Sequence, residues 1–205
     1  MPTALRVLIV IITGYAIGSV PVADFIARRR AGLDLRSSGD RNPGYWNAKE
    51  LLGRRAALPV LFGDATKGAL ATGAGVLLAV DHGWGIGYAG AAAAMIGHAY
   101  PAFAGFRGGR SVSCFAGAVC VLSPVAASIA IGLLLAAWAT GRSFAIAARV
   151  GVFGFPLAQL LIDGPHRTAA SGGLMTIIGL RFALAARSDR DHETVLNGRA
   201  TADPD

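Results

Sequence analysis

Two short segments hold most of the polar residues of this chain that could do chemistry. The first has the sequence GDRNPGYWN at residues 39–47, and the second has GHAYP at residues 97–101 followed by FRGGRSV at residues 106–112. Both combine glycine with basic, amide or imidazole side chains, and both interrupt long apolar stretches. Guanidinium and amide groups are good donors for phosphate and carbonyl oxygens. The two segments therefore favour a site that handles a phosphorylated, lipid-linked substrate.

The pair Gly108-Gly109 lies at the centre of the second segment, between Arg107 and Arg110. Adjacent glycines allow successive backbone N–H groups to converge on an anion. The flanking guanidinium groups offer forked donors that match phosphate oxygens. An apolar block begins at about Ser111, so the N-terminus of a helix is expected to add partial positive charge. The pattern predicts a phosphate-binding loop, although a turn whose arginines only set the membrane topology would produce it equally well.

Two ionisable residues, Asp64 and Lys67, lie inside an apolar block. Their i, i+3 spacing puts them on one helical face, so they can form an ion pair. Ionisable groups inside a membrane span are costly and face a partner or a cavity. Structural pairing is favoured here over a direct role in substrate binding. The four histidines are scattered, and Cys114 and Cys120 lack metal-ligand spacing, so no metal site is expected.

Long apolar blocks must position these polar residues. The chain is 54% hydrophobic and 15% charged, whereas a soluble domain carries about 25% charged residues. A membrane span needs roughly 17–25 apolar residues, and polar residues fall between the blocks instead of recurring with a helical period. These features predict an all-α, polytopic membrane helix bundle. The blocks are residues 7–27, 56–80, 84–106, 112–140, 144–162 and 168–186.

The basic residues predict the orientation of the chain. Residues 28–55 contain eight Lys and Arg against three Asp and Glu, whereas residues 81–83 contain no Lys or Arg. By the positive-inside rule the amino terminus lies outside the cell membrane and both polar segments lie on its cytoplasmic side. Because the basic charge follows membrane topology in this way, the net charge of +7 is no argument for a nucleic-acid partner.

The number of helices depends on residues 112–140. This block is long for one span and contains Ser123-Pro124 near its middle. A proline removes a helix hydrogen bond and can mark a break, although membrane helices also tolerate kinks. We favour two short helices that turn at this point, which gives about seven helices in total; one long helix would give six. Residues 1–187 then form the membrane domain, and residues 188–205 form a polar cytoplasmic tail.

The polar segments resemble the motifs of the bacterial acyl-phosphate:glycerol-3-phosphate acyltransferases. Residues 97–101 and 106–112 resemble the family's G-H-x-F-P and F-K-G-G-K-G-V, and residues 39–53 resemble its G-S-G-N-x-G-A-T-N-x-x-R-x-x-G. Residues 18–21, with the sequence GSVP, and residues 64–68, with DATKG, resemble its G-S-x-P and D-x-x-K-G. Four matches in the same order are fairly specific as a set, and the resemblance covers most of residues 5–187.

The resemblance implies a seven-helix membrane enzyme with its motifs on the cytoplasmic side. Such an enzyme transfers a fatty acyl group from acyl phosphate to glycerol-3-phosphate and forms lysophosphatidate within the membrane lipids, without a cofactor. By position, the implied catalytic residues are Asn42, Asn47, His98 and Arg110, with the two asparagine amides as donors to the acyl carbonyl. The implied phosphate-binding residues are Lys49, Arg107, Gly108, Gly109, Arg110 and Ser111. The implied supporting residues are Gly39, Asp40, Gly44, Asp64 and Lys67.

The chain also departs from the family pattern. Asp40 replaces a serine, Arg41 a glycine and Glu50 an arginine, for which the neighbouring Lys49 could substitute. The family's third motif, H-R-E-N-x-x-R-L-x-x-G-x-E, aligned on Gly198, has Ser188 at its histidine and Asp191 at its asparagine, with His192 nearby. The alternative to an active acyltransferase is therefore a non-catalytic relative that binds an anionic lipid or protein partner, or a small transporter.

Overall fold

The computed structural model describes residues 1–79 and 83–202, with the backbone alone for residues 188–202. Within these ranges it has nine α-helices, one short 3₁₀ helix and no β-strand, which confirms the predicted all-α fold. In chain order the helices are α1 (Thr3–Gly18), α2 (Val22–Ala31), α3 (Tyr45–Leu52), α4 (Arg54–Ala79), α5 (Gly85–Ala99), the 3₁₀ helix η1 (Ala102–Ala104), α6 (Val112–Leu122), α7 (Pro124–Ala139), α8 (Phe144–Asp163) and α9 (Pro165–Ala202).

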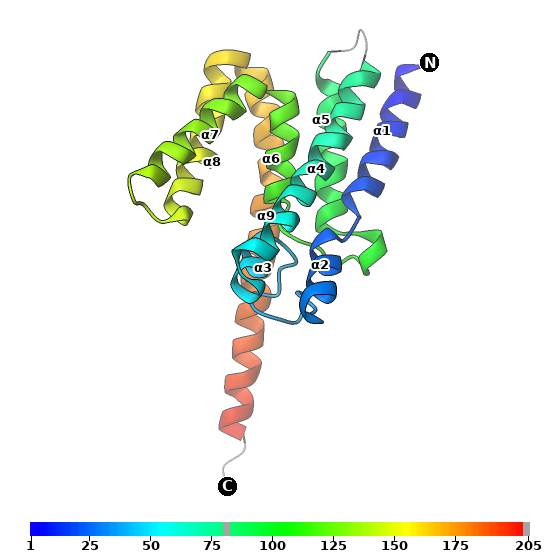
Figure 1. Ribbon diagram of the computed structural model, residues 1–205. Helices are drawn as coiled ribbons and strands as arrows, with labels where there is room; N and C mark the ends of the chain where they lie inside the picture. Colours follow the sequence, from blue (N-terminus) through cyan, green and yellow to red (C-terminus); the bar gives the residue numbers. More distant parts are fainter. Residues whose placement is uncertain (80–82, 203–205) are drawn as a thin grey trace.

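The helices form an elongated bundle whose polar connections gather at one end (Figure 1). Helices α1, α4, α5 and α6 pack side by side, and α7 and α8 form a hairpin next to them. Helix α9 packs against this group and continues past α3. Helices α2 and α3 and the segment between α5 and α6 lie at the lower end in Figure 1. The amino terminus and the α6–α7 and α8–α9 turns lie at the opposite end.

Prolines break two of the predicted apolar blocks. The break at Ser123-Pro124 separates α6 from α7, as the preferred interpretation of residues 112–140 predicted, and Pro124 begins α7 at a position that tolerates its missing N–H. A second break, between Gly18 and Val22, divides the first block into α1 and α2. Pro21 cannot continue the backbone hydrogen bonding of α1 and disfavours helical geometry at the preceding residue.

Small residues bring the central helices into backbone contact. A Cβ atom added to Gly18 would lie 2.2 Å from the carbonyl oxygen of Ala94 on α5. Cβ atoms added to Gly68 on α4 and Gly117 on α6 would lie only 1.9 Å and 1.8 Å from carbonyl oxygens of the opposite helix. Close approach of this kind favours helix association in lipid, where apolar burial gives no driving force. The small residues therefore fix the part of the bundle that carries the polar end.

A buried hydrogen-bond network joins the helices toward the opposite end. Gln159 of α8 donates to the hydroxyls of Ser123, at 2.6 Å, and of Tyr88, at 3.1 Å. The Tyr88 hydroxyl also lies 3.0 Å from the Ser171 hydroxyl on α9. These contacts connect α5, the α6–α7 junction, α8 and α9. Interhelical hydrogen bonds of this type stabilise helix packing in membranes.

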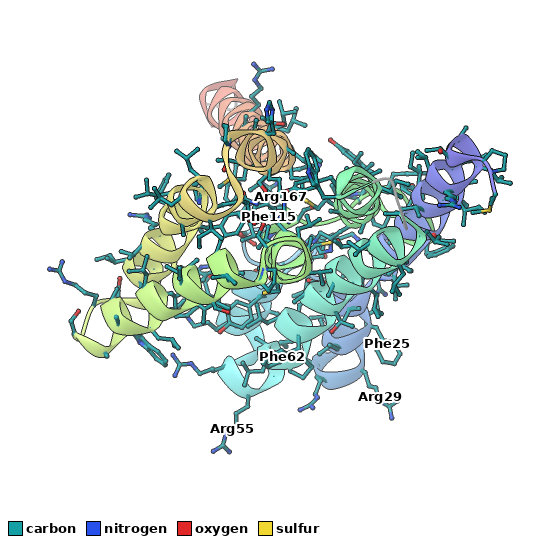
Figure 2. The ribbon with its side chains drawn as sticks, turned by 90° about the horizontal axis from the view of Figure 1, so that it is seen from above. Phe25, Arg29, Arg55, Phe62, Phe115 and Arg167 are labelled. Carbon is teal, nitrogen blue, oxygen red and sulfur yellow. The ribbon has the colours of Figure 1, made fainter. Side chains whose placement is uncertain are left out.

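The outer surface is apolar, as expected for a membrane protein. Three segments are long and apolar enough to cross a bilayer, namely Thr3–Ala31, Phe144–Asp163 and Pro165–Arg187, and α6 and α7 are shorter apolar helices. Figure 2 shows Phe25 and Phe62 pointing away from the bundle, where their exposed fractions are 66% and 64%. The backbone of α9 stays helical to Ala202, so the predicted polar tail begins as a continuation of this helix.

Candidate active site

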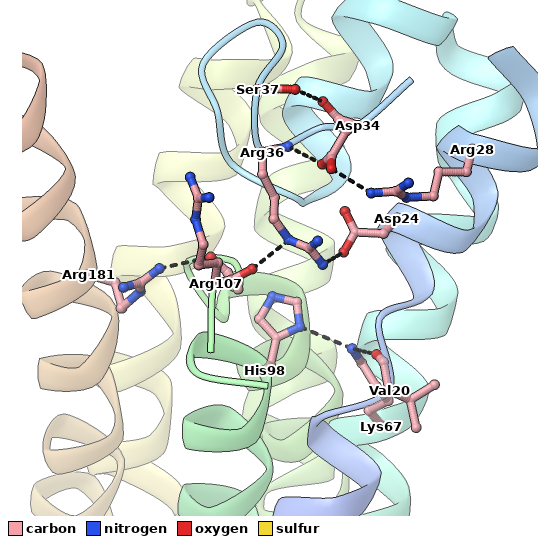
Figure 3. A network of polar contacts seen from close by, with 11 residues as sticks. Val20, Asp24, Arg28, Asp34, Arg36, Ser37, Lys67, His98, Arg107 and Arg181 are labelled. Carbon is pink, nitrogen blue, oxygen red and sulfur yellow. Dashed lines mark hydrogen bonds and ion pairs between the residues drawn. The ribbon is translucent and has the colours of Figure 1, made fainter. Parts of the chain in front are cut away.

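The polar end of the bundle brings together segments that are far apart in the sequence. The chain between α2 and α3 meets residues 106–111, here called the di-glycine loop, and both lie close to the beginning of α2 and to the middle of α4. Helix α9 contributes a side chain from the other side. Figure 3 shows the resulting network of polar contacts.

A buried cluster of Asp64, Lys67 and His98 forms the inner wall of the site. The Lys67 ammonium lies 2.9 Å from Asp64 Oδ1 and 3.1 Å from His98 Nδ1. It also donates to the Val20 carbonyl at 2.8 Å, one of the groups left outside α1 by the break at Pro21. The predicted pairing of Asp64 with Lys67 is therefore confirmed. His98, which is distant in the sequence, completes the cluster.

The cluster determines how His98 presents its ring. His98 Nδ1 lies 3.1 Å from the Lys67 ammonium, which can only donate hydrogen bonds, and 3.5 Å from Asp64 Oδ1. The shorter contact favours the tautomer in which Nδ1 accepts from Lys67 and Nε2 carries the proton. Nε2 faces the di-glycine loop, because a Cβ atom added to Gly109 would lie 2.4 Å from it. His98 is only 7% exposed. Its ring is therefore held in one orientation, with Nε2 directed at the loop.

The glycines of the loop serve close packing instead of forming an anion nest. Gly108 N donates to the Ala99 carbonyl at 3.2 Å, and Gly109 N donates to the His98 carbonyl at 3.1 Å. A Cβ atom on Gly108 would lie 2.0 Å from the His98 carbonyl oxygen. In this conformation both N–H donors are used within the protein, and phosphate binding by Gly108 and Gly109 stays a prediction.

The carbonyl oxygens of the same loop are covered by two arginines. Arg36 Nε donates to the Arg107 carbonyl at 2.9 Å. Arg181 of α9 donates through Nε to Gly109, at 3.2 Å, and through Nη2 to Gly108, at 2.8 Å. Figure 3 shows Arg36 and Arg181 approaching the loop from opposite sides. Three consecutive carbonyl groups therefore hold two guanidinium groups in place.

Asp24 and Asp40 hold two of the arginines of the site. Asp24, which is 6% exposed near the beginning of α2, pairs with the Nη2 atom of Arg36. Asp40 Oδ2 lies 3.0 Å from Arg110 Nη1, and Asp40 Oδ1 accepts from the backbone N–H of Asn42 at 3.1 Å. The Asp40–Arg110 pair directly joins the two polar segments that the sequence singled out. A carboxylate that replaces the family's serine thus has a defined partner.

Asn47, predicted to donate to an acyl carbonyl, makes its hydrogen bonds within the protein. It is fully buried, and its amide nitrogen donates to the carbonyls of Leu35, at 3.1 Å, and Ser38, at 2.9 Å. Its oxygen accepts from Asp40 N at 3.2 Å. Because both N–H donors are used, Asn47 is not placed to donate to an acyl carbonyl. It holds the connection between α2 and α3 instead, and Gly39 leaves room for it, since a Cβ there would lie 2.0 Å from Asn47 Oδ1.

Two predicted phosphate ligands lie elsewhere. The Lys49 ammonium lies 4.2 Å from the centre of the Trp46 ring, outside both cavities of the site. Ser111 is 1% exposed and its hydroxyl donates to the Met95 carbonyl at 2.8 Å, so it holds the start of α6. Glu50, which replaces the motif's arginine, is exposed and also lies outside the cavities. Gly44 is the residue that precedes α3.

Two adjoining cavities define the site. The smaller, of about 20 Å³, is lined by Asp24, Asp64, Lys67, His98 and Gly109, among others. The larger is a cleft of about 310 Å³ that shares Pro43 and Gly108 with the smaller one. Five arginines and one carboxylate line the cleft, so it is strongly positive. Its polar side chains are Arg36, Asp40, Arg41, Asn42, Arg107, Arg110 and Arg181.

Sequence reasoning missed Arg36 and Arg181 as residues of the site. Arg36 was counted only as one of the basic residues that set topology. The sequence did contain a signal for Arg181, because an arginine inside the last apolar block is costly and indicates a partner or a polar cavity. The side chains of Ser188, Asp191 and His192, the third-motif positions, lie outside the described part of the chain.

Comparisons with known proteins agree with this architecture. Residues 8–198 match the family described as glycerol-3-phosphate acyltransferase. The chain is 33% identical over 184 residues to a glycerol-3-phosphate acyltransferase of Desulforudis audaxviator, which covers 90% of the chain and 88% of that protein. It is 39% identical over 117 residues to one of Exiguobacterium sibiricum, which covers 57% of the chain and 55% of that protein.

The chain is also similar to a solved structure of PlsY, described as an integral membrane glycerol 3-phosphate acyltransferase, in its glycerol 3-phosphate form. The TM-score is 0.73 at 26% identity, with 94% of this chain and 93% of that chain covered. A second structure of PlsY, in its lysophosphatidic acid form, has a TM-score of 0.70 at 25% identity and covers the same shares.

Proposed function

The chain belongs to the glycerol-3-phosphate acyltransferase family, and from this premise we propose that it transfers a fatty acyl group from acyl phosphate to the 1-hydroxyl of glycerol-3-phosphate. The products are lysophosphatidate and phosphate, and the reaction belongs to phospholipid biosynthesis. The observation that carries the proposal is the arginine-lined cleft next to the buried Asp64–Lys67–His98 cluster. Nothing in this arrangement favours a transporter or a non-catalytic relative.

The cleft suits the anionic parts of both substrates. Arg110 and Arg36 present guanidinium groups that are held by carboxylates, and Arg107 lies exposed at the edge. Guanidinium donors held in place before binding recognise phosphate oxygens without a further ordering cost. We assign phosphate binding to these three side chains, in place of Lys49, Ser111 and the glycine N–H groups. The acyl chain lies in the surrounding lipid or along the apolar helix surface.

Positioning and charge stabilisation supply the catalysis. The hydroxyl oxygen of glycerol-3-phosphate forms the new ester bond with the carbonyl carbon. The bond from that carbon to the phosphate oxygen breaks, and the hydroxyl proton leaves with the phosphate. Negative charge develops on the carbonyl oxygen, where the Nε2–H of His98 and the amide of Asn42 are the candidate donors. Lys67 favours the form of His98 that donates from Nε2, and Asp64 holds Lys67 in place.

The positive-inside rule places the cleft on the cytoplasmic side of the cell membrane. The seven passes are α1, α4, α5, α6, α7, α8 and α9, which put the amino terminus and the cleft on opposite sides. Residues 1–187 are the membrane acyltransferase domain, and residues 188–205 are assigned as its polar cytoplasmic tail. Soluble glycerol-3-phosphate and the membrane-bound acyl phosphate then meet at one interface.

Purified protein in lipid nanodiscs tests the function. With palmitoyl phosphate and glycerol-3-phosphate it should form lysophosphatidate and phosphate in equal amounts, whereas palmitoyl-CoA should give no product. Empty nanodiscs control for chemical hydrolysis of the acyl phosphate. Failure of the protein to form lysophosphatidate with acyl phosphate, at a protein concentration that gives a folded monodisperse sample, would contradict the proposal.

A further inference from the structure

Arg181 reaches from α9 into the site without belonging to any of the motifs. We infer that Arg181 is a positioning residue for acyl transfer, which holds the di-glycine loop, and through it His98 and Arg110, in the reactive arrangement. The inference rests on the proposed function, because acyl transfer supplies its kinetic readout. A second readout, described below, does not depend on turnover.

The contacts of Arg181 use the specific shape of a guanidinium group. Nε and Nη2 donate to neighbouring carbonyls of the loop, at 3.2 Å for Gly109 and 2.8 Å for Gly108. The guanidinium carbon lies 4.8 Å from the centre of the Tyr100 ring. A planar fork can bind two adjacent acceptors and stack on an aromatic ring at once, whereas an ammonium group cannot reproduce this geometry.

Movement of Gly108 and Gly109 would displace the reactive groups next to them. Gly109 lies against Nε2 of His98, and its N–H donates to the His98 carbonyl. Arg110 follows Gly109 in the chain and pairs with Asp40 across the cleft. A displacement of about 1 Å can lower the rate of an oriented reaction by roughly 100-fold. The loop therefore needs a support that is stiffer than its own glycines.

The support comes from both sides of the loop. Arg36, fixed by Asp24, donates to the Arg107 carbonyl, while Arg181 holds the next two carbonyls from α9 (Figure 3). Arg36 lies in the connection between α2 and α3. Arg181 lies on α9, the last helix, so the geometry of the site depends on how α9 packs against the bundle. Loss of Arg181 should loosen the loop while leaving the phosphate-binding Arg36 and Arg110 in the cleft.

Three substitutions in nanodiscs test this inference: Arg181→Ala, Arg181→Lys and Arg181→Gln. For Arg181→Ala, kcat should fall roughly tenfold or more, as expected for the loss of two charge-assisted hydrogen bonds, while the KM for glycerol-3-phosphate changes less than about threefold. Arg181→Lys and Arg181→Gln should recover part of kcat, because each retains a donor. The matched control is Arg187→Ala on the same helix, where the side chain is exposed; it should behave as the parent does.

Backbone hydrogen exchange gives the readout that is independent of turnover. In Arg181→Ala the backbone amides of residues 106–111 should exchange faster with solvent. Without Arg181 on their carbonyls, Gly108 and Gly109 are held less firmly, so their N–H bonds to Ala99 and His98 open more often. Helices α4 and α5 should keep the parent's protection. The inference is overturned if Arg181→Lys keeps the parent's kcat, if the substitutions raise only KM, or if exchange in the loop is unchanged. An inactive parent would refute the proposed function, and the exchange measurement would still decide the role of Arg181.

Discussion

Asp40 and Arg110 lie seventy residues apart in the chain and form an ion pair of 3.0 Å between Oδ2 and Nη1 at the edge of the arginine-lined cleft. The two residues belong to the two polar segments of the sequence, so this pair ties the segments into one site. The guanidinium group of Arg110 also stacks on Phe182 of α9, 4.7 Å from the ring centre. Arg110 is therefore held before any substrate arrives, and Asp40 competes with a bound phosphate for its donors.

Substitution of Asp40 by asparagine tests this competition. Asp40→Asn keeps the size of the side chain and removes a negative charge from the cleft, so the KM for glycerol-3-phosphate should fall. A partly exposed ion pair is worth about 0.2–1 kcal/mol, which corresponds to a decrease of up to roughly fivefold. Glu50→Gln removes an exposed carboxylate outside the cleft and should leave KM unchanged. An increased KM for Asp40→Asn, or the same decrease in both variants, would show that Asp40 does not oppose phosphate binding.

Asn47 should matter for stability before it matters for catalysis. Asn47→Ala leaves the buried Leu35 carbonyl without its side-chain donor, whereas the Ser38 carbonyl keeps the backbone N–H of Arg41. An unsatisfied buried polar group costs about 1–3 kcal/mol, so the free energy of unfolding should fall by about that amount. Asn42→Ala should change this free energy little and lower kcat/KM. Denaturant unfolding in detergent measures the free energies of the two variants, and initial rates measure kcat/KM. A parent-like stability of Asn47→Ala would return Asn47 to the candidate substrate donors.

Arg41 occupies a backbone conformation that suits glycine. Its φ angle is 56°, at the position where the family motif has glycine. Left-handed geometry costs a residue with a side chain roughly 1–2 kcal/mol, so Arg41→Gly should be more stable than Arg41→Ala. At Lys49, within α3, the order should reverse, because alanine exceeds glycine by about 1 kcal/mol in a helix. The free energies of unfolding of the four variants test this prediction. An Arg41→Ala variant more stable than Arg41→Gly would show that the backbone at Arg41 is not strained.

The orientation of the membrane domain can be tested by thiol labelling. In a background with Cys114→Ala and Cys120→Ala, a cysteine at Arg29 should resist an impermeant thiol reagent in intact cells, because this exposed residue is placed on the cytoplasmic side. A cysteine at His166, exposed at the opposite end of the bundle, should react readily. Labelling of the Arg29 position together with protection of the His166 position would reverse the proposed topology.

The membrane fold was largely predictable, because apolar blocks separated by polar residues leave few alternatives for a chain in lipid. The break at Ser123-Pro124 was found because proline has a local effect that a sequence displays directly. The break at Pro21 and the short helix α3 were missed. Residues 7–27 were treated as one apolar block despite Pro21, and α3 is too short to form an apolar block.

The site was predictable only where its contacts are local or lie within motifs. Asp64 and Lys67 are three residues apart, so helical geometry alone suggested their pair. The partners of Asn47 and Lys49 depend on how the connection between α2 and α3 folds back on itself, and motif matching does not specify where a side chain donates its hydrogen bonds. Arg181 joined the site through tertiary packing of α9, which the sequence indicated only as a charged residue inside an apolar block.

The affinity of the cleft for phosphate is the point on which everything else depends. The most direct measurement is the initial rate of lysophosphatidate formation as glycerol-3-phosphate is varied, for the parent, Arg110→Ala and Arg110→Lys at saturating acyl phosphate. Loss of a charge-assisted hydrogen bond of about 1.5–3 kcal/mol should raise KM by roughly 10-fold to 150-fold in Arg110→Ala. Arg110→Lys should recover part of the loss, because the charge remains without the fork. An unchanged KM in Arg110→Ala would contradict phosphate recognition by this cleft.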